Sequence, residues 1–247
     1  MSSPAREEQV PAPLLSDSSL RLSEVDTYIA GSHILQGVTF DVTEGETTVL
    51  IGRNGAGKST TLRSILGLWP IAHGSITLGG ERLNGRPAHA VARQSVGFVP
   101  EDREIFVGLT VEENLKLAQR GGGGAAIDKV YGLFPDLRLA KDRSAGAMSG
   151  GQQQMLAIGR ALINRNRVLL VDEPTKGLAP VIVKHLAGIF ERLRAEGETI
   201  LLVEQNIEFA RQVGDRFFIL DEGRVVHGGR MDEIDRDRAL LRRYIGV

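Results

Sequence analysis

A run of eight residues in the first quarter of the chain matches the phosphate-binding loop pattern G-x-x-x-x-G-K-[ST]. Gly55 and Gly57 lack side chains, so the backbone N–H groups around them can turn inward and form a nest for an anion. Lys58 is expected to bridge the β- and γ-phosphates of a nucleoside triphosphate, and Ser59 to bind magnesium. The nucleotide-binding residues that we predict here are Gly52, Arg53, Asn54, Gly55, Ala56, Gly57, Lys58, Ser59 and Thr60.

Two adjacent acids follow an apolar run at residues 168–171. In open α/β sheets ligands bind at the carboxyl ends of the strands, so Asp172 and Glu173 are expected beside the phosphate-binding loop. Asp172 is predicted to hold magnesium through water, and Glu173 to polarise the attacking water as the catalytic base. The alternative is two solvated acids at a strand end, which does not explain why Pro174 follows them in a chain with a phosphate-binding loop.

A second glycine-containing loop, at residues 149–152, precedes a helical pattern with one apolar face. Two glycines before a helix start predict another nest, suited to a γ-phosphate. One triphosphate cannot be wrapped by both loops of the same chain if a helical insert holds them apart. We therefore expect a head-to-tail pair in which each chain completes the other's site, through Ser149, Gly150, Gly151 and Gln152.

The elements that must position these loops follow from the periodicity of the chain. Residues 38–43 alternate like a half-buried strand, and 47–51 form a strand that leads into the phosphate-binding loop, followed by a helix at 60–68. Further along we predict strands at 168–171 and 200–203, a helix ended by Gly197, and a hairpin at 217–227. Between 111 and 139 the pattern is only helical. The sequence therefore predicts an α/β core with an inserted helical subdomain.

Composition excludes several classes of protein. The chain has 247 residues and a formal net charge of -1, which argues against a nucleic-acid partner. With 0 cysteines it forms no disulfide and no thiolate metal site, which fits the cytosol. No run approaches the roughly 20 apolar residues that cross a bilayer. Residues 1–19 are predicted to be a disordered leader without the apolar core of a secretory signal, so another subunit must hold the protein at any membrane.

The phosphate-binding loop, the loop at 149–152 and the acids at 172–173 together resemble an ATP-binding cassette ATPase, from about Leu20 to Tyr244. The resemblance implies an α/β P-loop NTPase (RecA-like) core with an N-terminal antiparallel β subdomain and an inserted helical subdomain. It places the ATPase domain at 20–247, with a core at 20–100 and 149–230, the insert at about 101–148 and a C-terminal helix at about 231–247. It also implies ATP and Mg²⁺ as cofactors.

Residues 32–35, 110–115, 153–162, 177–180 and 203–206 resemble the second ATPase subunit of branched-chain amino acid importers, a family that also serves amides and urea. That resemblance implies a heterodimer with a second ATPase subunit and two transmembrane permease subunits, with an extracytoplasmic solute-binding protein as an indirect partner. The chain would then sit on the cytoplasmic face of the plasma membrane. Its segment 101–106 is expected near the permease contact, since it joins core to insert.

Three positions depart from the general cassette pattern: Glu101 replaces a glutamine, Gln205 replaces a switch histidine, and Ala179 replaces an aspartate. All three resemble the importer subgroup. Gln205 can donate a hydrogen bond to a γ-phosphate but carries no charge, so we predict it as a catalytic residue together with Glu173 and Lys58. Glu101 is predicted on the metal side with Ser59 and Asp172, where magnesium or water must screen it. We expect slow hydrolysis without a partner.

The sequence leaves open several residue roles and alternative functions. Cassettes stack adenine on an aromatic residue before the phosphate-binding loop; Tyr28 is one candidate, and Ile29 is the other. The glycines at 121–124 form a hinge or a plain surface loop, and the charged segment 232–243 reads as a solvated terminal helix. Beside import, the alternatives are an exporter ATPase, a soluble cassette protein acting on DNA or ribosomes, and a cassette that binds ATP only as a dimerisation switch.

Overall fold

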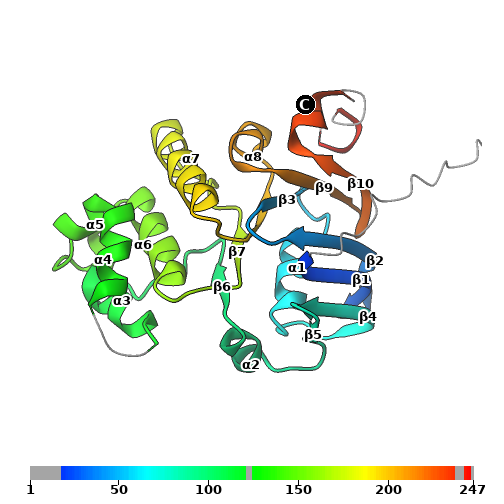
Figure 1. The fold of residues 1–247 in the computed structure, drawn as a ribbon, viewed down its shortest axis with the longest axis horizontal. Coiled ribbons are helices and arrows are strands. Elements are labelled where there is room, and N and C mark those ends of the chain that lie inside the picture. Colours follow the sequence, from blue (N-terminus) through cyan, green and yellow to red (C-terminus); the bar gives the residue numbers. More distant parts are fainter. Residues whose placement is uncertain (1–17, 121–123, 237–241, 246–247) are drawn as a thin grey trace, which may run out of the picture.

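The computed structural model describes residues 18–120, 124–236 and 242–245, and two sheets form its framework (Figure 1). The larger sheet has six strands in the order β10-β9-β3-β8-β7-β6. Its parallel members are β3 (Thr47–Ile51), β6 (Val96–Val99), β7 (Val168–Asp172), β8 (Ile200–Glu204) and β9 (Arg216–Asp221), while β10 (Arg224–Arg230) returns antiparallel to β9. All residues of β3, β7 and β8 are buried, as expected for parallel strands covered on both faces.

The smaller sheet is antiparallel, in the order β2-β1-β4-β5. Its strands are β1 (Ser18–Ile29), β2 (Ser32–Thr43), β4 (Ile71–Leu78) and β5 (Glu81–Arg82). Helix α1 (Lys58–Ile65) follows the phosphate-binding loop and contacts both β2 and β7, and α2 (Ala88–Arg93) packs against β6. These strands confirm the predicted antiparallel β subdomain.

Helices form a separate lobe at one end of the larger sheet (Figure 1). It contains α3 (Val111–Ala118), α4 (Ala125–Leu133) and α5 (Pro135–Leu139), which confirms the helical pattern predicted between 111 and 139. Helix α6 (Gly150–Leu162) packs against α3 and α5 and also against β6, so it joins this lobe to the sheet. Two further helices, α7 (Pro180–Ala195) and α8 (Ile207–Val213), pack against each other.

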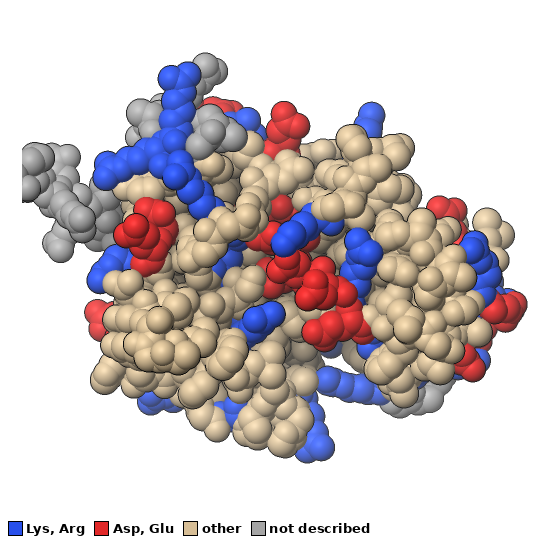
Figure 2. Space-filling view, turned by 180° about the vertical axis from the view of Figure 1, so that it is seen from behind, with Lys and Arg blue, Asp and Glu red and all other residues tan. Residues whose placement is uncertain are grey.

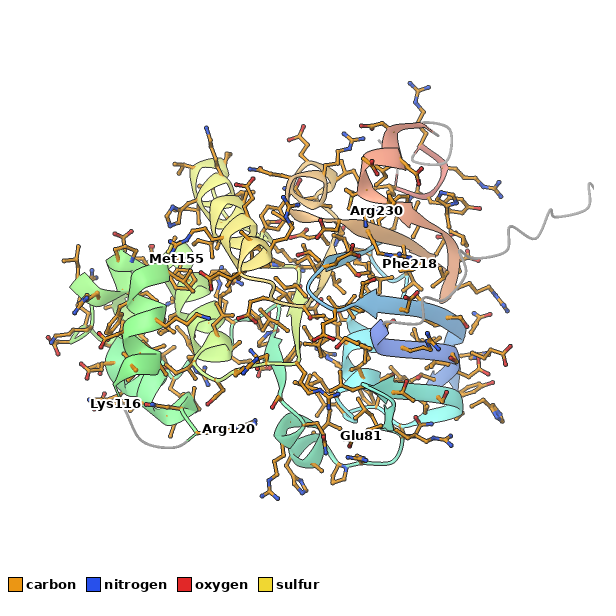
Figure 3. All side chains as sticks on the ribbon, in the orientation of Figure 1. Glu81, Lys116, Arg120, Met155, Phe218 and Arg230 are labelled. Carbon is orange, nitrogen blue, oxygen red and sulfur yellow. The ribbon has the colours of Figure 1, made fainter. Side chains whose placement is uncertain are left out.

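The larger sheet separates two hydrophobic clusters, because side chains alternate along each strand. Val49 and Leu169 face the cluster that includes α6, α7 and the helical lobe. Leu50 and Leu170 face the cluster shared with α1 and the antiparallel sheet. Figure 3 labels one member of each: Met155 in the lobe and Phe218 in the layer between the sheets.

Several predicted bounds need correction. The helix after the phosphate-binding loop runs from Lys58 to Ile65 instead of 60–68, because Gly57 with φ 106° ends the loop and Gly67 with φ 70° follows the last turn. The predicted terminal helix at about 231–247 begins as a 3-10 helix, Met231–Arg236. The predicted leader lies almost entirely outside the described residues, as do 121–123 of the glycine run. Among the described residues, no helix has the length and hydropathy to cross a bilayer.

Candidate active site

The predicted site residues lie at the carboxyl ends of three neighbouring strands, β3, β8 and β7. The phosphate-binding loop follows β3, Asp172 ends β7 and Glu173 comes directly after it, and Gln205 follows β8. Since parallel strands end at the same edge of a sheet, these three segments are brought side by side. In Figure 2, acidic side chains gather in the middle of the face seen from behind, between the helical lobe and the sheets, with basic side chains beside them.

The phosphate-binding loop has the backbone that an anion site requires. Gly55 and Gly57 have φ values of 82° and 106°, in the left-handed region that side chains disfavour. A Cβ on Gly52 would lie 2.3 Å from the carbonyl oxygen of Leu220, so a larger residue cannot fit there. Helix α1 starts at Lys58 without any side-chain cap, which leaves its first backbone N–H groups for a ligand.

Lys58 is buried, with 4% of its side chain exposed. Its Nζ donates to the carbonyl oxygens of Gly52 at 2.9 Å and Arg53 at 3.1 Å. The same Nζ lies 3.1 Å from Oε1 of Glu173, whose side chain is 8% exposed. The predicted phosphate ligand and the predicted base therefore form a buried ion pair.

Ser59 and Asp172 meet as the sequence predicts. The Ser59 hydroxyl donates to Oδ1 of Asp172 at 3.1 Å. Burial raises the pKa of Asp172 to about 6; the negative charges of Glu101 and Glu173 add to the rise, and the Ser59 hydrogen bond opposes it. A hydroxyl and a carboxylate side by side are oxygen ligands that fit Mg²⁺, which keeps its remaining positions for water and substrate phosphates. Among the described residues no cluster of three His, Cys, Asp or Glu offers an all-protein metal cage.

Glu101, predicted on the metal side, is bound by Lys176 in an ion pair and hydrogen bond. This contact joins the segment after β6 to the segment after β7. The charge of Glu101 still raises the pKa of Asp172, so its carboxylate lies close enough to be felt by the predicted magnesium ligand. Sequence reasoning missed Lys176, because 75 residues separate it from Glu101.

Gln205 contacts the predicted base directly. Its Nε2 donates to both carboxylate oxygens of Glu173, at 2.8 and 2.9 Å, and to Oδ1 of Asn54 at 2.6 Å. Glu173 itself has φ 43°, a left-handed conformation in a residue that carries a side chain. One amide group thus connects the phosphate-binding loop with the residue that follows β7.

Tyr28 lies at the end of β1, 46% exposed, and its ring stacks on His33 with a centroid distance of 4.3 Å. His33 in turn hydrogen-bonds Asp26 at 3.0 Å. The neighbouring Thr27 points toward α1, where its hydroxyl bonds Ser64 at 3.0 Å. Among the described residues, no hydrogen bond or ring contact joins Tyr28 or Ile29 to the phosphate-binding loop, so which of them meets adenine stays a prediction.

The predicted nest of two glycines before a helix at residues 149–152 needs correction. Gly150 and Gly151 are the first residues of α6 and form no separate nest before it. Ser149 caps the helix: its hydroxyl accepts from the Gln152 backbone N–H at 3.3 Å, and its own N–H donates to the Gln152 side chain at 3.1 Å. A Cβ on Gly151 would lie 2.9 Å from Ile182 of α7, so glycine lets the two helices approach.

Two residues near the site escaped sequence reasoning. Glu204 ends β8 with its side chain buried, and Arg103 donates to the side chains of Gln153 and Gln154 on α6. A charged residue closing an apolar strand is the signal that could have singled out Glu204. Arg103 had no such signal.

Comparison with known proteins gives a consistent result. The family model described as ABC transporter matches residues 35–176. A high-affinity branched-chain amino acid transport ATP-binding protein, BraG of Pseudomonas aeruginosa, is 46% identical over 84% of this chain and 91% of its own length. A probable branched-chain amino acid transport ATP-binding protein, LivF of Archaeoglobus fulgidus, is 38% identical over 82% and 88%. The solved structure of an ATP-binding subunit of an ABC transporter superposes with a TM-score of 0.78 and 31% identity, over 90% of this chain and 94% of that one.

Proposed function

The chain belongs to the ATP-binding cassette transporter family, and from that membership we propose that it is the ATP-hydrolysing subunit of an importer for branched-chain amino acids or related amides. The observation that carries this proposal is the convergence of Lys58, Asp172 and Glu173 at one sheet edge, in a chain similar over most of its length to such subunits. The exporter alternative is not favoured by these relatives.

Phosphate binding is assigned to the loop at 52–59. The uncapped N-terminus of α1 offers backbone N–H groups, and Lys58 adds one positive charge. We propose that Lys58 turns from Glu173 to the β- and γ-phosphates when ATP binds. Ser59 and Asp172 would hold magnesium, which would supply charge neutralisation at the phosphate oxygens.

Hydrolysis is assigned to Glu173, with Gln205 beside it. Glu173 accepts a proton from water, whose oxygen bonds to the γ-phosphorus while the bond to the β–γ bridging oxygen breaks. The products are ADP and inorganic phosphate. Gln205 holds both oxygens of Glu173, so it fixes the direction in which the base faces the water.

The second ATPase subunit is proposed to complete this site from the other side. Among the described residues, no hydrogen bond or ion pair links 149–152 to the phosphate-binding loop of the same chain. The N-terminus of α6, with Ser149 as its cap, is therefore free to face a partner's nucleotide in a head-to-tail pair. We propose a heterodimer with a sister ATPase, and slow hydrolysis by the chain alone.

Permease docking is proposed at a groove of about 240 Å³ between β6 and the helical lobe. Arg103, Arg120 and Arg160 line it. Phe106 and Val107, in the neighbouring segment, are 45% and 60% exposed although both are apolar. A permease subunit seated there, one of the two in the assembly, would hold the chain at the cytoplasmic face of the plasma membrane, and an extracytoplasmic binding protein would deliver the solute.

Affinity purification of the chain from native membranes in mild detergent, followed by mass spectrometry, tests this assembly. We expect two multispanning permeases and a second cassette subunit. A single permease or a half-transporter would indicate export. Ribosomal or DNA-bound partners without any membrane protein would overturn the transport function.

A further inference from the structure

Glu204 is a buried carboxylate beside the active site that the proposed mechanism does not use. It is the last residue of β8, and 2% of it is exposed. A carboxylate this deeply buried is costly unless its oxygens are paired. All four hydrogen bonds described for it come from uncharged donors.

The four donors come from two different loops. Oε1 of Glu204 accepts from the backbone N–H and the hydroxyl of Thr175, at 3.2 and 2.8 Å. Oε2 accepts from the backbone N–H groups of Gln205 and Asn206, at 3.0 and 3.1 Å. An ionised carboxylate has about four lone-pair sites, so this set occupies all of them. Burial raises the pKa of Glu204, and these hydrogen bonds act against the rise.

These contacts connect the two residues that meet at the reacting water. Thr175 lies two residues after Glu173, in the segment that follows β7, and Gln205 directly follows Glu204. The backbone N–H of Glu173 also donates to the Val203 carbonyl at 2.9 Å, so the pairing with β8 continues one residue beyond the end of β7. With its backbone fixed in this way, the Gln205 side chain reaches both oxygens of Glu173.

We propose that Glu204 is a positioning residue for ATP hydrolysis: it clamps the segment after β7 to the backbone of Gln205, so that the Gln205 amide holds Glu173 in its working orientation. The inference rests on the proposed ATPase function. Displacing a catalytic group by about 1 Å can lower a rate by about a hundredfold, so a clamp at this place affects turnover more than nucleotide binding.

Replacing Glu204 by glutamine breaks the clamp with almost no change in shape. The amide oxygen can accept from only one of the two loops, and the NH₂ group then faces N–H donors of the other. A matched control is Asp215→Asn, the same change of carboxylate to amide at the opposite end of the sheet. Oδ2 of Asp215 accepts from the Thr47 backbone N–H at 2.9 Å, where β3 begins.

The test measures ATP turnover of the full-length chain with Mg²⁺ as wild type, Glu204→Gln, Gln205→Ala, the double variant and Asp215→Asn. We expect Glu204→Gln to lower kcat at least tenfold with KM for ATP within twofold, and Asp215→Asn to change neither by more than twofold. In the Gln205→Ala background, Glu204→Gln should lower kcat less than twofold further, since it acts through Gln205.

A spectroscopic measurement tests the contact independently of activity. The NMR signal of the Gln205 side-chain amide is assigned by its loss in Gln205→Ala. In Glu204→Gln its chemical shift should move toward that of exposed glutamines. In Asp215→Asn its chemical shift should not change. If Glu204→Gln does not fold, Thr175→Val removes one donor and keeps the carboxylate; kcat should then fall at least twofold at unchanged KM.

The outcomes separate the two proposals. An unchanged kcat in Glu204→Gln, or in Thr175→Val where only that variant folds, overturns the positioning role. The positioning role is also overturned if Glu204→Gln lowers kcat by the same factor in the Gln205→Ala background as in the wild-type background. A wild-type chain without any ATP turnover, both alone and in the co-purified complex, overturns the ATPase function instead, and the Gln205 signal then decides whether the clamp exists.

Discussion

Nζ of Lys58 lies 3.1 Å from Oε1 of Glu173, so the proposed phosphate ligand and the proposed base hold each other. Gln205 occupies both oxygens of the same carboxylate. With both oxygens of its carboxylate already paired, Glu173 has few lone-pair sites left to orient a water molecule. Phosphates that draw Lys58 away leave Oε1 with Gln205 as its remaining partner, which makes the activity of the base depend on bound nucleotide.

Replacing Lys58 by methionine should weaken both nucleotide binding and the fold. Glu173 would remain buried without its cation, and breaking a buried ion pair from one side costs about 3 kcal/mol or more. Urea unfolding measures this loss. The double variant Lys58→Met/Glu173→Gln removes the unpaired charge and should recover part of the stability; equal stability of wild type and Lys58→Met would contradict the pairing.

Replacing Glu173 by glutamine should abolish most turnover while ATP still binds. Loss of a general base lowers rates by about 10² to 10⁴. With ATP and the second ATPase subunit, this variant should elute as a stable dimer in size-exclusion chromatography with light scattering. Glu196→Gln, a change at a half-exposed carboxylate at the end of α7, serves as the control. ATPase activity in Glu173→Gln equal to wild type would show that the base is elsewhere.

Asp172 should make stability depend on pH. Burial raises its pKa from the ordinary 3.8 to about 6, so between these values the folded chain keeps a proton that the unfolded chain has lost. Stability from this group therefore grows as the pH falls through 6. In metal-free urea unfolding, we expect wild type to gain about 1 kcal/mol relative to Asp172→Asn between pH 7.5 and 5.

The same protonation should oppose magnesium, because the proton and the cation compete for one carboxylate. The concentration of Mg²⁺ that half-saturates ATP turnover should rise below about pH 6. A stability difference between wild type and Asp172→Asn that is flat with pH would contradict the raised pKa.

Replacing Val107 by aspartate should separate docking from catalysis. Its side chain is 60% exposed beside the arginine-lined groove, so a charge there changes the surface and leaves the core intact. We expect unchanged melting and unchanged turnover of the isolated chain, with loss of permease subunits in co-purification. Leu139→Asp, at a residue 88% exposed on the same lobe, is the matched control and should retain the permeases.

Replacing Ala179 by aspartate should stabilise the fold. Ala179 is the N-cap of α7, its backbone has the extended conformation of a cap, and it makes no side-chain cap hydrogen bond. An oxygen-bearing side chain there can accept from an N–H of the first turn, a gain of about 1 kcal/mol. Denaturant unfolding measures it. Ala179→Asn should give a similar gain, and an absence of gain in both would show that the first turn is already satisfied.

The features that the sequence predicts best are those that a local pattern determines, such as an apolar run or the spacing of glycines. The apolar runs of β3, β7 and β8 and the glycines of the phosphate-binding loop appear at their predicted places, and these alone bring Lys58, Ser59, Asp172 and Glu173 together. The bounds of strands β1 and β4 are harder to predict, because their pairing contains two register shifts that interrupt the alternation.

Contacts between segments that are far apart in the chain cannot be predicted from local patterns. The nest expected at 149–152 is a helix start, because Ser149 and Gln152 satisfy the capping-box pattern that the two glycines obscured. Glu101 and Lys176 are 75 residues apart, and Glu204 and Thr175 are 29 apart. Only the strand order places these side chains within reach.

The division of the hydrophobic interior by the larger sheet has a mechanical consequence. Neighbouring residues of one strand, such as Leu169 and Leu170, belong to opposite halves of the molecule, one toward the helical lobe and the other toward α1. The sheet is thus a shared wall between the half that carries α1 and the half that carries the helical lobe. The loops after β6, β7 and β8 lie together at the carboxyl rim of this wall, so a change at the phosphate-binding loop meets them directly.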